Sequence, residues 1–143
     1  MTVPTPEIRK RILRNGDLTD PSTPSPMLTL EEFFTGNDDP GSICCNISDA
    51  PSPVDIHRIL NTIRDRSDVA GVYVEVKEIE DDQYDMWPFS DTVWVVTSAS
   101  IEEIKKSLGD VICADDILTS WDDHQLEEVP VPEGMRPLGL WWD

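Results

Sequence analysis

Hydrophobic residues recur with helical spacing between residues 52 and 66. The apolar positions follow the i, i+3, i+4, i+7 rule, which places them on one face of a helix. They are Ile56, Ile59, Leu60 and Ile63. Ser52 suits the N-cap and Pro53 the first helical position. The pattern predicts a helix over 52–66 with one buried stripe, and it places His57 on the solvated side.

Two further helices are predicted from the residues that favour helix ends. Thr29 can cap a short helix that ends at Gly36, a residue type suited to the left-handed position after a helix. Ser100 and Glu103 have the spacing of a capping box, and Gly109 would end that helix.

Residues 42–47 alternate as a short strand does. Ile43, Cys45 and Ile47 would share one face, and Cys44 would lie on the other. Because a free cysteine behaves more often as a small hydrophobic residue than as a reactive centre, we expect Cys45 in the core.

Three more strands are predicted further along the chain. Residues 69–80 alternate, with valines inward and polar residues on a wet outer face. Residues 91–97 are apolar on both sides, which favours a central strand, and residues 138–142 form the last strand. Between the last two of these strands, residues 115–121 are expected to add a turn or two of helix.

The order of these elements is βαββαβ, which predicts an α+β fold of the ferredoxin-like type. In it, two helices cover one face of a four-stranded antiparallel sheet. A related α+β sheet with its helices on one side is the alternative. Residues 28–143 are interpreted as the single domain. Residues 1–27 contain five prolines and are interpreted as an extended or mobile arm, whose basic stretch PEIRKRIL can form a short helix and dock on the body.

The charge of the chain is strongly one-sided. Eleven Lys and Arg face 29 Asp and Glu, for a net charge of −18, of which −17 falls on residues 37–143. Such a body attracts basic proteins and repels nucleic acid and anionic membranes. The alternative is that the acidity serves solubility alone. No apolar run has the length of a membrane span and no secretory signal opens the chain, so we expect a cytoplasmic protein with three reduced thiols.

No motif in the sequence names a reaction. Phosphate-binding glycine loops, CxxC pairs, HExxH and a Ser-His-Asp order are all missing. We therefore expect no catalytic residue, no metal and no cofactor. The alternative is a hard cation held by one of the acidic turns, although neither turn has the spacing of a calcium-binding loop.

The residues that we interpret as partner-binding lie in two acidic turns and beside them. They are Asn37, Asp38, Asp39, Glu80, Asp81, Asp82, Asp85 and Trp87. Trp87 has two interpretations, since it can fold its loop down as a hydrophobic plug or remain exposed as a contact residue.

The segments LEEFFTGNDDPGSICCNI, VYVEV and WPFSDTVWVVTS resemble a family of small acidic bacterial proteins of unassigned function. Proteins of this sort resemble the immunity proteins of bacterial toxin–immunity systems. The resemblance covers residues 28–98 and implies a protein that binds a cognate toxin domain and blocks it without catalysis.

The leading hypothesis is a non-catalytic, cytosolic acidic protein that binds a basic protein, most specifically an immunity protein that neutralises a cationic toxin domain. It would bind neither nucleic acid nor membrane. One alternative is a carboxylate-based enzyme dependent on a divalent metal, and another is an acidic mimic of nucleic acid.

Overall fold

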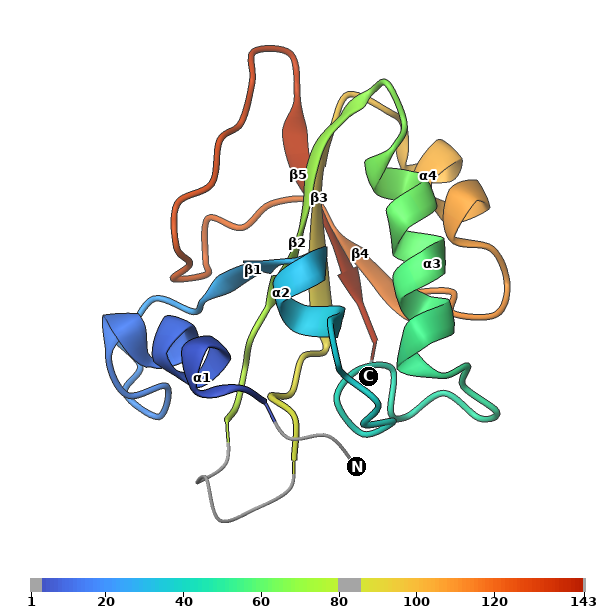
Figure 1. The fold of residues 1–143 in the computed structure, drawn as a ribbon. Helices are drawn as coiled ribbons and strands as arrows, with labels where there is room; N and C mark the ends of the chain where they lie inside the picture. The colour runs from blue at the N-terminus through green and yellow to red at the C-terminus, as the bar shows by residue number, and fades with distance from the viewer. Residues whose placement is uncertain (1–3, 80–85, 143) are drawn as a thin grey trace.

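The protein is described from a computed structural model that covers residues 4–79 and 86–142. A five-stranded antiparallel sheet forms its centre, in the order β1-β2-β3-β5-β4 (Figure 1). The strands are β1 (Met27–Thr29), β2 (Val69–Glu75), β3 (Thr92–Thr97), β4 (Asp116–Leu118) and β5 (Arg136–Trp141). Strand β3 lies in the middle of the sheet, as its apolar residues on both sides predict, and all six of its residues are buried.

Three helices cover one face of the sheet: α2 (Leu30–Phe34), α3 (Pro53–Arg64) and α4 (Ile101–Leu108) (Figure 1). Their apolar side chains meet the inward residues of the strands in one core, where Val74 and Val93 are fully buried. The predicted capping box of Ser100 and Glu103 starts α4, and the predicted N-cap Thr29 starts α2, where Glu32 completes a capping box as well. In the described part of the chain, no helix is long and apolar enough to cross a membrane.

The N-terminal segment is folded against the body. Helix α1 (Pro6–Ile12) continues into a 3-10 turn, η1 (Leu13–Asn15). Ile12 has no exposed surface and belongs to the main core, and Ile8 packs against that core. The basic side of the helix is therefore held at a fixed place beside β1 (Figure 1).

The α+β prediction is confirmed, together with most of its local detail. The helix predicted over 52–66 is α3, and the strand predicted over 91–97 is β3. Strand β2 begins at Val69 as expected, with inward valines. Gly36 adopts φ 79°, which is the left-handed backbone expected after α2.

The predicted strand over 42–47 is wrong. This segment is a series of turns, and Cys44 has φ 55°, a left-handed conformation that no strand contains. The turn reverses the predicted facing of the two cysteines, so Cys44 is buried in the core and Cys45 is exposed. The sheet instead gains β1, which begins within the segment interpreted as an arm and pairs with β2 at the edge of the sheet.

The predicted helical turns over 115–121 are also wrong, since residues 116–118 form the edge strand β4. The sheet consequently has five strands rather than four, and the ferredoxin-like arrangement is not confirmed. The pairing of β4 with β5 is non-local, which is why a local pattern could not indicate it.

Candidate protein-binding surface

The first acidic turn is largely built into the fold. Asn37 is 3% exposed and donates its side-chain amide to Ser42 Oγ at 3.0 Å, while its carbonyl oxygen accepts the backbone N–H of Asp39 at 2.9 Å. Asp39 is 6% exposed and accepts the backbone N–H groups of Gly41 and of Trp87. Only Asp38 of the predicted triplet is exposed.

Trp87 is 3% exposed and packs in the main core, as the plug interpretation predicts. Its backbone N–H donates to Asp39 Oδ2 at 3.0 Å, which joins the two predicted acidic turns. Nearby, Ser90 N–H donates to the Ser42 carbonyl at 2.8 Å. The remaining predicted residues, Glu80, Asp81, Asp82 and Asp85, lie outside the described residues.

The largest described stretch of exposed acidity lies elsewhere, in residues 107–135, which we call the acidic connection. It contains eight acidic residues and neither Lys nor Arg. They are Asp110, Asp115, Asp116, Asp122, Asp123, Glu127, Glu128 and Glu133. All but Glu127 are exposed. The sequence already contained this signal, in the absence of any Lys or Arg over 29 positions.

After β4, the acidic connection crosses the second face of the sheet, the face opposite the helices, toward β1 (Figure 1). It begins at the end of α4 and contains β4, which pairs with β5. Further along, Gln125 O accepts the Ser25 N–H at 2.9 Å, and Glu127 N–H donates to Ser25 O at 3.0 Å. These parallel contacts anchor its middle to the segment that precedes β1.

The floor under the acidic connection is rigid. Trp94 has no exposed surface and donates its indole N–H to Glu75 Oε1 at 2.8 Å. Its ring lies over Gly139, where the Cβ of any other residue would come within 2.8 Å of it. The rings of Trp121 and His124 pack edge-on against Trp94, with centroids at 5.6 and 5.4 Å.

Above this floor the acidic connection forms a hollow of about 230 Å³. It is lined by Trp121, His124, Leu126, Glu127, Glu128 and Val129. The lining thus combines apolar and aromatic surface with two adjacent carboxylates. We call it the Trp121 hollow. A larger hollow of about 580 Å³ shares residues 126–129 with it and extends along Arg11 and Arg14.

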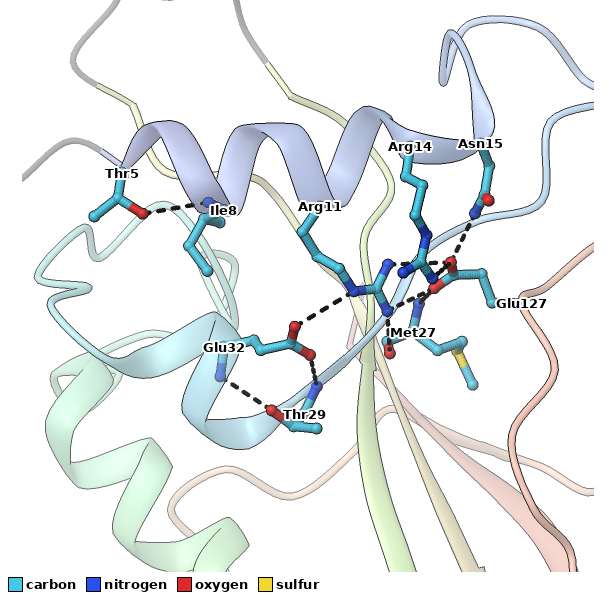
Figure 2. A network of polar contacts seen from close by, with 9 residues as sticks. All are labelled: Thr5, Ile8, Arg11, Arg14, Asn15, Met27, Thr29, Glu32 and Glu127. Carbon is cyan, nitrogen blue, oxygen red and sulfur yellow. Dashed lines mark hydrogen bonds and ion pairs between the residues drawn. The ribbon is translucent and has the colours of Figure 1, made fainter.

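Glu127 joins the acidic connection to the basic helix (Figure 2). Its carboxylate accepts two hydrogen bonds from Arg11, at 3.1 and 2.8 Å, and one from Arg14 at 2.8 Å. Asn15 and the backbone N–H of Met27 also donate to it, at 2.7 and 2.8 Å.

Burial alone would raise the pKa of Glu127, but its hydrogen bonds, first among them those from Arg11, lower it to about 2. The carboxylate is therefore ionised at neutral pH although its side chain is only 10% exposed. Arg11 also pairs with Glu32 at 3.3 Å, which connects α1 to α2 (Figure 2).

The chain's own arm shows that the acidic connection accepts a basic helix through arginine side chains. Over residues 4–79 and 86–142, no group of three or more His, Cys, Asp or Glu side chains is arranged to hold a metal ion.

His57 does not lie in solvent as expected. Its ring stacks on that of Phe34 in the α2–α3 interface, with the two ring centroids 4.9 Å apart.

Comparison with known proteins gives one family. The family described as "Uncharacterized protein YfbO family" matches residues 4–140. The chain is 39% identical over 141 residues to "Uncharacterized protein YfbO" of Escherichia coli (strain K12), covering 98% of this chain and 99% of that protein. No solved structure matches.

Proposed function

This chain belongs to the YfbO family, and we propose that it is a non-catalytic, cytosolic acidic protein that binds a basic protein partner. The observation that carries the proposal is the acidic connection, in which seven exposed carboxylates occur without any Lys or Arg. Such a surface speeds the encounter with a basic protein and selects against acidic ones.

The internal docking of α1 supports the same conclusion. Arg11 and Arg14 reach Glu127 from a helix that also carries Arg9 and Lys10. A short basic helix is thus a form of partner that this surface accommodates within its own chain. Within the acidic connection the arm pairs with Glu127, and the exposed carboxylates, Asp123 and Glu128 among them, extend beyond this pair.

The specific partner that we propose is the basic domain of a bacterial toxin, with this chain as its immunity protein. The resemblance of residues 28–98 to acidic immunity-like proteins supports this choice, and so does the net charge of −18. An acidic protein of this kind would cover the basic active-site cleft of a nuclease, because that cleft is built to attract phosphates.

The test uses the basic toxin-like product of a gene adjacent to the one for this chain. Co-expression should restore growth, and isothermal titration calorimetry should detect a complex that weakens as salt is raised. If such products gave neither growth protection nor a complex, the immunity proposal would be refuted.

A matched pair of variants tests the surface. The double change Asp123→Asn and Glu128→Gln removes two negative charges from the acidic connection. The control, Glu7→Gln and Glu102→Gln, removes two from exposed sites on α1 and α4. We expect the first pair to weaken binding by about tenfold and to slow association, and the control to change the affinity by less than about twofold. Equal effects would show that only the net charge matters.

A further inference from the structure

We propose that the Trp121 hollow is the anchor pocket for one arginine side chain of the basic partner. This inference rests on the proposed function and adds to it a place and a residue type. The hollow measures about 230 Å³ and is open beside the exposed Glu128.

The shape and rigidity of the hollow fit an anchor. Trp121 is half-buried, and its ring is held by edge-on packing against Trp94, which cannot shift because it lies on Gly139 and is hydrogen-bonded to Glu75. A pocket whose walls are already ordered loses little conformational freedom on binding. Leu126 and Val129 offer apolar surface for the three methylene groups of an arginine stem.

The carboxylate that the rim offers to a cation is that of Glu128. Glu127 and Glu128 both line the hollow, and no Lys or Arg of the described chain lines it. Glu127 already accepts bonds from Arg11, Arg14 and Asn15, so its carboxylate is largely occupied. The exposed Glu128 is therefore the carboxylate that an incoming guanidinium would meet.

Arginine fits these walls better than lysine does. A planar guanidinium can stack on the face of an indole and bind a carboxylate with two parallel hydrogen bonds, whereas an ammonium group does neither in the same geometry. The chain's own arm is not the occupant, because none of its described residues lines this hollow and Ile12 keeps the arm seated in the main core.

The test is an NMR titration of the ¹⁵N-labelled full chain with a nine-arginine peptide and, separately, with a nine-lysine peptide of equal charge. We expect the arginine peptide to bind about threefold or more tightly, with the largest shifts at the Trp121 indole and at residues 126–129. Glu128→Gln and Leu126→Ala should each weaken arginine binding by about fivefold. Glu102→Gln, which removes one exposed charge from α4, is the control and should change it by less than about twofold.

Binding of both peptides with equal affinity, or shifts spread over the acidic surface away from the hollow, would overturn the anchor pocket and leave the proposed function standing. If neither peptide bound, both the anchor pocket and the proposed function would be overturned. Leu126→Ala is accepted only if the variant keeps the amide spectrum of the folded chain, and Glu128→Gln provides the same test without changing a packed side chain.

Discussion

Trp94 and Glu75 form a buried hydrogen bond of 2.8 Å between β3 and β2, on the sheet face that carries no helix. Both residues are at most 2% exposed. Lys77 completes the arrangement by pairing with the second carboxylate oxygen of Glu75 at 2.8 Å. The sequence predicts a wet face here, and the face is instead covered by the acidic connection. The same cover gives the molecule its candidate binding surface.

Trp94→Phe removes the indole donor and leaves one oxygen of a buried carboxylate without its partner. We expect this change to lower the free energy of unfolding by about 1–3 kcal/mol more than Trp87→Phe does. Trp87 is the matched control, because it is equally buried and its Nε1 has no hydrogen-bond partner among the described residues. Urea denaturation of both variants gives the comparison. Equal losses would show that the bond to Glu75 contributes nothing beyond ring packing.

The Glu127 network predicts a specific acid sensitivity. A free glutamate has a pKa of about 4.3, and this one has a pKa of about 2 in the fold. Because the folded value is the lower, the unfolded chain binds the extra proton first as the pH falls. The stabilisation is complete above about pH 4.5 and is lost progressively toward pH 2.

Glu127→Gln should therefore be less stable than the parent chain at pH 7, by about 2–4 kcal/mol, and the difference should shrink below pH 4. Denaturation midpoints measured from pH 2 to pH 7 test this. Glu128→Gln is the control at the neighbouring exposed position and should stay within about 0.5 kcal/mol of the parent throughout. A constant gap between Glu127→Gln and the parent would contradict the assigned pKa.

The three cysteines should differ sharply in reactivity. Burial raises the pKa of Cys44 to about 12, with the neighbouring Cys45 adding to the effect. Cys45 and Cys113 are exposed. Ellman's reagent at pH 8 should therefore modify two thiols in the native protein, and the third only after unfolding. Rapid modification of all three would contradict the turn that buries Cys44, and Cys44→Ser would identify the slow thiol.

His57 predicts a second pH dependence, near neutrality. Burial lowers its pKa, Glu31 opposes this and Arg64 adds to it. Since the folded pKa lies below the unfolded value of about 6.5, the stabilising effect of neutral His57 is present above that pH and is lost as the pH falls. His57→Phe keeps the stacking on Phe34 and should show a smaller stability loss between pH 7.5 and 5.5 than the parent. Identical slopes would contradict the assignment.

The elements that were predictable from sequence have local causes. The end of α2 at Gly36 and the capping box of Ser100 depend on residues a few positions apart, so a local pattern contains them. The strand predicted around Cys44 failed because alternation over six residues does not reveal a left-handed turn. Strand β1 has three residues and gains its partner, β2, from more than 40 positions away.

The binding surface was only partly predictable. Trp87 was assigned to partner binding with a plug role as its other interpretation, and its burial agrees with the plug role alone. The burial of Asn37 and Asp39 follows from hydrogen bonds that no local pattern shows. The pairing of Arg11 with Glu127 spans 116 positions and has no sequence signature. The charge pattern of the acidic connection could have been read directly, because a stretch with eight acidic residues and neither Lys nor Arg needs no structure to be noticed.

The contacts around Met27 also bear on how copies of this protein behave at high concentration. Its N–H donates to Glu127 and its carbonyl accepts from Arg11, so two side chains occupy the hydrogen-bonding positions that a sixth strand would use. An edge strand with free backbone groups is a template for sheet-to-sheet aggregation, and here that template is closed by an ion pair. Arg11 and Glu127 thus close the β1 edge of the sheet to a further strand, independently of any partner that the acidic surface binds.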